Sequence, residues 1–317
     1  MELPQGKYAN GEITDNDVVT IKIPGHQDKE LLVADSYEVL AAFVRAGLVP
    51  DPRIQIPQIK DMEVFEDDIF ICAYRKSGTH WVWELCQMIL QGKAEYSKQG
   101  KYSMMLEYHL PEEFTTATTP RVFNSHLLPN NLPKKIFDKN CKIIFVLRNP
   151  KDVATSYYHQ IVDMGYPMLD KTTTWQQFLQ FFTNDDKPWS NNWFHYIREW
   201  QNFLAEANHP ILVMKYEDIN SNTASCISQL SDFIGREHNE DLFKEIESKC
   251  QLKNLRKAEK ERDQGILGMS SDAMSQHYRK GIIGDWKNHF TVSDSEQFDQ
   301  ALQEKLKGVE LHFQYEY

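Results

Sequence analysis

A polar turn between two apolar segments constrains the chain more than any other feature of its sequence. Ile69–Tyr74 is a short, nearly uncharged run, typical of a strand buried on both faces. Trp81–Leu90 repeats apolar residues at helical spacing. Arg75–His80, between them, offers a lysine, hydroxyls, a glycine and the free N–H groups of a helix start, which together suit an oxyanion such as phosphate. This pattern predicts a P-loop-like anion-binding turn, but not a Walker loop, because Lys76 precedes the only glycine.

Length, charge and composition exclude several classes of protein. The 317 residues, 41% of them hydrophobic, suffice for one large globular domain, and neither an internal repeat nor a break in composition marks a second. A formal net charge of −11 without a Lys/Arg stripe argues against nucleic-acid binding. Any anionic ligand must therefore be bound by local cations.

Cysteine usage and the lack of long apolar segments indicate the compartment. The five cysteines are odd in number and form no C-x-x-C pair, so we expect reduced thiols and no metal site. The N-terminus lacks a signal-peptide pattern, and no segment approaches the roughly 18 apolar residues of a membrane span. We therefore expect a cytoplasmic protein without a membrane or nucleic-acid partner.

Four short apolar runs each end at a polar cluster. They are 69–74, ending at Lys76; 121–123, ending at His126; 142–147, ending at Arg148; and 211–215, ending at Tyr216. Helical patterns follow near Trp175–Phe182, Trp193–Ala205, Thr223–Ile234 and Asn239–Cys250. The alternation predicts an α/β fold, a single domain with a central, mostly parallel sheet flanked by helices. Ligands bind beyond the carboxyl ends of such strands, so the four clusters should converge.

The sequence before the first core strand and between residues 91 and 119 is less regular. Residues 1–60 are predicted to be a loop-rich N-terminal segment, with a helix over Asp35–Ala46 and with Pro50, Pro52 and Pro57 breaking structure. Residues 91–119 are polar, with short helical pieces.

The turn at 74–81 resembles the 5′-phosphosulfate loop of the cytosolic sulfotransferases. The family has Y-P-K-S-G-T-T-W where this chain has Y-R-K-S-G-T-H-W. Further family motifs follow in order near 120–129, 148–156, 216–218 and 279–296, so the resemblance covers nearly the whole chain. It implies one domain over 1–317 that transfers the sulfuryl group of 3′-phosphoadenosine 5′-phosphosulfate (PAPS) to a hydroxyl or amine of a small-molecule acceptor and releases PAP.

The resemblance implies catalytic roles for four residues. Lys76 would stabilise the leaving phosphate, and Asn124 would help hold the sulfuryl group. His126, in P-R-V-F-N-S-H-L-L-P against the family's P-R-x-x-K-T-H-L-P, would be the general base, because a neutral imidazole can accept a hydroxyl proton. Ser156 would position Lys76 through the 3′-phosphate.

The resemblance also implies a cofactor site and a dimer. The cofactor-binding residues would be Lys76, Ser77, Gly78, Thr79, His80, Trp81, Arg148, Ser156, Tyr216, Cys250, Leu252, Arg279, Lys280 and Gly281. Arg148 and Ser156 match the family's R-x-x-x-D-x-x-x-S pair, and an arginine suits phosphate because its fork binds two oxygens. The 279–296 stretch would hold both the 3′-phosphate clamp, R-K-G-x-x-G-D-W-K, and a homodimer motif at Lys287, Thr291, Val292 and Glu296.

Several positions depart from the family pattern. Asn124 replaces a lysine and carries no charge, so transfer is expected to slow about tenfold. His80 replaces a threonine and would bind the 5′-phosphate better when protonated, and Arg75 replaces a proline. Cys250 and Leu252 stand where the family usually has Thr and Phe. The acceptor pocket is predicted to contain Met104, Met105, Tyr108, His126, Gln160, Met164 and Tyr166.

Two other functions stay open at this point. One is a catalytically impaired family member that binds PAP or PAPS without transfer, as Asn124 and His80 would allow. The other is an enzyme that uses sulfation as a step toward dehydration, as a family member that acts on retinol does. A P-loop kinase is disfavoured by the missing Walker glycine.

Overall fold

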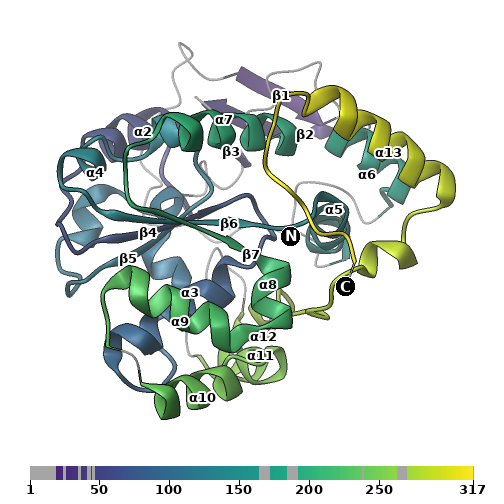
Figure 1. Ribbon diagram of the computed structural model, residues 1–317. Coiled ribbons are helices and arrows are strands. Elements are labelled where there is room, and N and C mark those ends of the chain that lie inside the picture. The colour runs from purple at the N-terminus through teal and green to yellow at the C-terminus, as the bar shows by residue number, and fades with distance from the viewer. Residues whose placement is uncertain are drawn as a thin grey trace.

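A four-stranded parallel sheet forms the centre of the molecule (Figure 1). The computed structural model describes residues 19–23, 26–34, 37–40, 44, 47–163, 172–183, 192–237, 239–262 and 270–316. The strand order is β5–β4–β6–β7, and the strands are β4 (Ile69–Ala73), β5 (Val122–Ser125), β6 (Lys142–Leu147) and β7 (Ile211–Lys215). Each neighbouring pair is parallel. The prediction of a single α/β domain with a parallel sheet is therefore confirmed.

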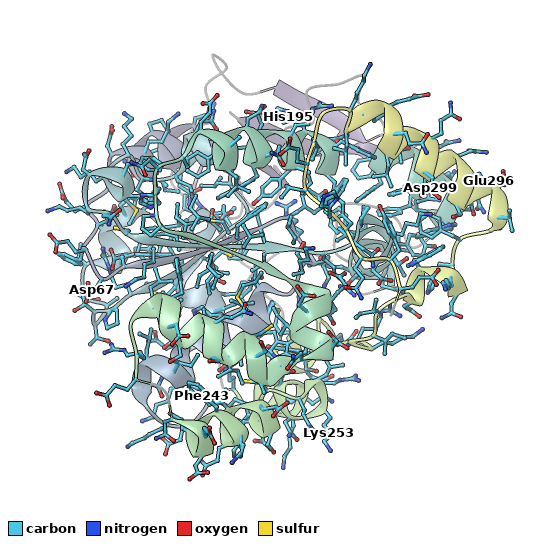
Figure 2. The ribbon with its side chains drawn as sticks, in the orientation of Figure 1. Asp67, His195, Phe243, Lys253, Glu296 and Asp299 are labelled. Carbon is cyan, nitrogen blue, oxygen red and sulfur yellow. The ribbon has the colours of Figure 1, made fainter. Side chains whose placement is uncertain are left out.

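The sheet is buried because helices cover both of its faces. Successive residues of β4 alternate between two hydrophobic clusters, with Phe70 in one and Ile69 and Ile71 in the other. Figure 1 shows α2 and α7 on one side of the sheet and α3 and α9 on the other. Figure 2 shows the side chains that fill the space between these layers. This cover explains why the strands read as continuous apolar runs.

The helices predicted with both ends lie close to their predicted positions: α3 (Thr79–Gln91), α6 (Trp175–Thr183), α7 (Trp193–Glu206), α9 (Thr223–Ile234) and α10 (Glu240–Lys249). Further α-helices, whose bounds were not predicted, are α5 (Pro150–Tyr158), α8 (Tyr216–Ser221), α11 (Leu252–Glu261), α12 (Ser271–Ser275) and α13 (Val292–Lys305). Short helices are α4 (Lys135–Asp138), the 3₁₀ turns η1 (Lys101–Met104), η2 (Leu106–Tyr108), η3 (Pro111–Phe114), η4 (Pro129–Asn131) and η6 (Asp285–Asn288), and the π-helical turn η5 (His159–Asp163). Asn149 caps α5, since its side-chain oxygen accepts from the Asp152 amide.

The prediction of a loop-rich N-terminal segment is wrong for the described residues. Strands β1 (Val19–Ile23), β2 (His26–Ala34) and β3 (Tyr37–Leu40) form an antiparallel sheet. The expected helix over 35–46 is a strand at 37–40, because pairing with β2 overrides the local helical pattern.

The expected break at the prolines is also wrong, because α2 (Pro52–Asp61) is a helix. Asp51 caps it by accepting a hydrogen bond from the Arg53 amide, and Pro52 occupies the first turn. The helix continues past Pro57 with Ile56 and Ile59 buried, so packing outweighs the cost of the internal proline.

Candidate active site

The turn after β4 is held in a conformation that its sequence alone does not require. Lys76 has a φ of +68° and Gly78 a φ of +102°, both in the left-handed region. A Cβ atom on Gly78 would lie 2.7 Å from Cδ2 of Tyr216, so only glycine fits. Helix α3 then begins, with the Trp81 and Val82 amides donating to the Gly78 carbonyl. The first amides of α3 are left beside the cations of the turn.

Arg148, at the carboxyl end of β6, fixes this turn from the neighbouring strand. Its guanidinium donates to the Lys76 carbonyl oxygen at 2.9 Å and lies 4.0 Å from the ring centre of Tyr216. Tyr216 itself follows β7 and packs edge-on against Trp81. The Nε atom of Arg148 is buried without a hydrogen-bond partner. The ends of β4, β6 and β7, three of the four strand ends predicted to converge, therefore meet here.

A cleft of about 230 Å³ opens beside the turn. It brings together the predicted Lys76, Ser156, Gln160 and Arg279. It also contains residues that the sequence did not predict: His159, Arg256, Lys260, Asp272, Ser275, Gln276 and His277. The lining is therefore polar and mainly basic, which suits an anionic ligand.

Lys76 carries a charge that no carboxylate neutralises among the described residues. Its Nζ atom lies 3.3 Å from Nδ1 of His277, a neutral partner. Burial, followed by the charges of Arg148, Lys101 and Arg279, lowers the pKa of Lys76 to about 7. The ammonium would therefore gain from an anion in the cleft.

The geometry of His126 favours a neutral base. Its Nδ1 atom lies 2.7 Å from the Ala73 carbonyl oxygen, which can only accept, so Nδ1 carries the proton and Nε2 has the free lone pair. Burial and the charges of Lys101 and Arg75 hold the pKa of His126 well below its usual value. The imidazole is thus unprotonated at neutral pH, with the lone pair of Nε2 free.

Two buried polar residues flank His126. Glu107 accepts hydrogen bonds from the His126 amide and from the Ser125 hydroxyl, which fixes the end of β5. Asn124 is fully buried, and neither of its amide atoms has a hydrogen-bond partner. Such an orphaned amide is costly unless a ligand completes it.

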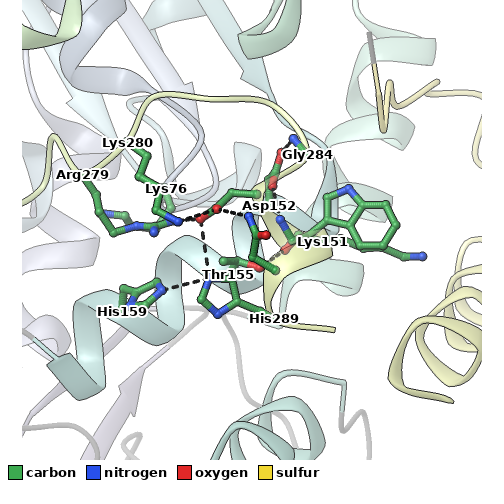
Figure 3. Close-up of polar contacts among 12 residues, drawn as sticks. Lys76, Lys151, Asp152, Thr155, His159, Arg279, Lys280, Gly284 and His289 are labelled. Carbon is green, nitrogen blue, oxygen red and sulfur yellow. Dashed lines mark hydrogen bonds and ion pairs between the residues drawn. The ribbon is translucent and has the colours of Figure 1, made fainter. Parts of the chain in front are cut away.

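Residues 279–291 form a basic loop that includes the turn η6 and ends where α13 begins, and two aspartates hold it in place. Arg279 and Lys280 both donate to Asp285, and Figure 3 shows them beside Lys76. Burial alone would raise the pKa of Asp285, but the hydrogen bonds from Lys280, Arg279 and Asn288 keep it below its usual value. Asp152, in the first turn of α5, accepts from the amides of Gly284 at 2.7 Å and Trp286 at 3.0 Å.

Comparison with known proteins identifies the family. The profile of the sulfotransferase domain matches residues 66–310. The chain belongs to the sulfotransferase family. Sulfotransferase 1C2 of Homo sapiens is 31% identical over 267 residues, which cover 81% of this chain and 88% of that protein. Sulfotransferase 1A1 of Bos taurus is 32% identical over 269 residues, covering 81% of this chain and 90% of that protein.

Solved sulfotransferase structures share the fold. The crystal structure of mouse sulfotransferase SULT7A1 complexed with PAP matches with a TM-score of 0.66 and 27% identity, covering 80% of this chain and 89% of that chain. Retinol dehydratase in a complex with retinol and PAP matches with a TM-score of 0.68, covering 90% of this chain and 92% of that chain. Its identity is 18%, which shows the common fold alone.

The other predicted cofactor-binding residues of this sulfotransferase lie in different surroundings. Ser77 and Thr79 are buried in the turn. Leu252 packs on Gly281, since a Cβ atom added to Gly281 would lie 2.7 Å from Leu252 Cδ2. Cys250 is fully buried in the hydrophobic cluster under α3, with its sulfur 3.9 Å from that of Met88. It is a core residue in this arrangement.

His80 is enclosed by tyrosines rather than open to solvent. Its ring nitrogens lie 3.1 Å from the Tyr102 hydroxyl and 3.4 Å from the Tyr278 hydroxyl. Burial and the charges of Lys101 and His277 hold the pKa of His80 well below its usual value. His80 is therefore neutral near pH 7, and any hydrogen bond that it gives is uncharged.

The predicted acceptor residues are only partly described. Met105 is buried, and Met104 and Tyr108 pack against the hydrophobic core. Gln160 lines the cleft, with its side-chain oxygen buried and without a hydrogen-bond partner. Met164 and Tyr166 lie outside the described residues.

Sequence reasoning missed three residues close to the turn. Lys101 and Glu107 come from the irregular segment around η1 and η2, where no periodicity marks a position. His277 directly precedes Tyr278-Arg279-Lys280, and this position beside the basic motif was the available signal.

We predict that Asp152→Asn loosens the basic loop. Asp152 Oδ2 accepts from Gly284 and Asn149 and Oδ1 from Trp286, so whichever oxygen becomes an amide nitrogen then faces a donor. The free energy of unfolding should fall by about 2 kcal/mol, and the Gly284 and Trp286 amides should lose protection from hydrogen exchange.

The exposed Asp241→Asn is the matched control and should change stability by less than about 0.5 kcal/mol. Unchanged protection of both amides in Asp152→Asn would show that other contacts hold the loop.

Proposed function

We propose that this chain is a PAPS-dependent sulfotransferase that transfers a sulfuryl group to a hydroxyl or amine of a small molecule and releases PAP. The observation that carries the proposal is Lys76 at the cleft, a cation that no carboxylate of the described residues pairs with. The PAP found with the mouse sulfotransferase, whose sequence is 27% identical, supports the choice of donor.

The residues of the cleft fit a nucleotide with two phosphates. Lys76 and the first amides of α3 suit the 5′-phosphosulfate, whereas Ser156 and Arg279 suit the 3′-phosphate. Buried polar atoms without partners, Nε of Arg148 and Nε2 of His277, provide unused hydrogen bonds at the same place. Trp81 and Tyr216 would flank the adenine.

The chain's own residues then act in an in-line transfer. When bound, PAPS supplies the sulfuryl group, and PAP, which keeps the 5′-phosphate, is the leaving group. His126 Nε2 accepts the acceptor's proton as the acceptor oxygen or nitrogen bonds to sulfur and the bond from sulfur to the bridging oxygen breaks. Lys76 stabilises the negative charge that remains on the phosphate, and Ser156 positions Lys76 through the 3′-phosphate. Asn124 offers its unused amide to the sulfuryl group.

Transfer of labelled sulfate from PAPS to a panel of phenols, sterols, aliphatic alcohols and amines tests this function. We expect a sulfated product. Because Asn124 is uncharged, a catalytically impaired binder would instead bind PAP and give no product with any acceptor. An enzyme that proceeds to dehydration would give a product without sulfate, which mass spectrometry distinguishes.

Several features support the remaining proposals about acceptor and compartment. We propose that Met104, Met105, Tyr108 and Gln160 bind the acceptor together with His126, and for Met164 and Tyr166 the same role rests on the sequence alone. Within the described residues, no helix is long and apolar enough to cross a membrane. All five cysteines are buried and free, which fits the reducing cytoplasm that we propose as the compartment.

We predict that Val292→Glu converts a homodimer into a monomer. Val292 has 76% of its surface exposed at the start of α13, beside Thr291, which caps that helix, and one turn from Glu296 (Figure 2). An exposed apolar side chain in a fixed turn is suited to an interface between two copies, together with Lys287. Analytical ultracentrifugation should show dimers for the parent chain and monomers for the variant. A monomeric parent chain would contradict the proposal.

We predict that His126→Ala lowers the rate of transfer about 10²–10⁴-fold, because the general base is lost. Since His126 lies on the acceptor side, PAP affinity should stay within about twofold of the parent value. The exposed His312→Ala serves as the control and should leave both quantities unchanged. Parent-level turnover in His126→Ala would exclude this residue as the base.

We predict that PAP binding takes up protons above about pH 7. Burial lowers the pKa values of Lys76 and Lys101 to about 7, so both are largely neutral in the free chain at pH 8. A bound phosphate favours the ammonium forms and raises both pKa values. Affinity should therefore fall as pH rises from 7 to 9, a range in which phosphate, with a second pKa near ~6, no longer titrates.

Calorimetry at pH 8 in two buffers of different ionisation enthalpy measures the proton uptake directly. An apparent binding enthalpy independent of the buffer would contradict the assignment of these lysines to the site.

A further inference from the structure

Lys101 is a buried cation that the fold alone does not explain. Its side chain is 3% exposed, and its ammonium donates to the Thr79 hydroxyl at 2.7 Å. Its Nζ atom also lies 5.1 Å from the ring centre of Tyr102. No carboxylate of the described residues is within ion-pair distance of this ammonium. Burying a charge on a neutral hydroxyl is costly unless an anion joins it.

The position of Lys101 puts this charge at the turn after β4. Helix η1 packs against β5 and α3, and Thr79 is the first residue of α3. The charge of Lys101 contributes to the lowered pKa values of four site residues, Lys76, His80, His126 and His277. Glu107 and Glu259 act on Lys101 in the opposite sense, but more weakly than its burial. Lys101 is thus electrostatically coupled to the whole group.

Asn124 indicates independently that the site lacks a positive charge at the position where the sulfotransferase pattern has a lysine. This residue stands where the sulfotransferase pattern has a lysine, and its amide is buried without a partner. An amide supplies a hydrogen bond but no charge. Lys101 lies in η1, which packs against β5, the strand that carries Asn124.

We propose that Lys101 is a donor-binding residue whose ammonium, together with the Thr79 hydroxyl, binds the 5′-phosphosulfate end of the donor and supplies the charge that Asn124 lacks. This inference rests on the proposed function. The inference goes beyond the proposed function because Lys101, a second cation beside Lys76, comes from a segment that carries no recognised motif.

The test compares Lys101→Met with the parent chain by calorimetry, using two probes. PAP carries both phosphates, whereas adenosine 3′-monophosphate lacks the one that Lys101 would contact. Loss of a charged hydrogen bond should weaken PAP binding about 10- to 100-fold and leave adenosine 3′-monophosphate within about twofold. Lys98→Met, an exposed lysine of the same segment, is the matched control for charge and should change neither.

A second comparison separates charge from structure. Methionine fills nearly the same space without a buried charge, so the ligand-free Lys101→Met should melt no lower than the parent chain.

Each other outcome has a distinct meaning. PAP affinity unchanged in Lys101→Met, or an equal loss for both nucleotides, would overturn this inference and leave the proposed function standing. A folded parent chain that binds no PAP would overturn the proposed function itself, and this inference with it.

Discussion

Positive charge that the protein does not itself neutralise is the constraint on which the site depends. Lys101 is buried and Lys76 is half-buried, and the loss of solvent lowers the pKa of each to about 7. Arg148 adds a third charge from the end of β6. Such a group is costly by itself, since buried charges are stable only when paired. An anion in the cleft would remove the cost of the unpaired charges. Binding of the anion and protonation of the two lysines are therefore coupled.

This lack of neutralisation is local, because the same chain pairs its other buried cations. Arg121 is held by Asp68 under the sheet, and Arg262 by Glu84 and Glu259 beside α11. With a net charge of −11, carboxylates are abundant. That no carboxylate of the described residues pairs with Lys76 or Lys101 therefore marks a place suited to an anion rather than a defect of the fold.

Much of the fold could be predicted from the sequence, because the core elements carry strong local signals. Parallel strands covered on both faces are apolar along their buried length, and β6 reads in that way from Ile143 to Leu147. Local signals failed where pairing or packing decides. Strand β3 forms because β2 lies beside it, and α2 tolerates Pro57 because its apolar face is buried.

The site shows the same division. Lys76, Arg148, Ser156 and Arg279 belong to recognisable motifs. The structure lines one cleft with Lys76, Ser156 and Arg279, and Arg148 donates to the Lys76 carbonyl oxygen. Lys101 and Glu107 lie in a polar segment without periodicity, so only the packing of η1 and η2 against β5 reveals them. The carboxylate–amide contacts that hold the basic loop, such as Asp152 to Gly284, join residues 132 positions apart and leave no mark in the local sequence.

The most direct test of the central claim is to titrate the purified chain with PAP and, separately, with unphosphorylated adenosine. If unneutralised cations define the site, PAP binds and its affinity falls steeply as salt is added, whereas adenosine gives no measurable heat. Equal binding of both compounds, or no binding of PAP by the folded chain, would contradict the claim.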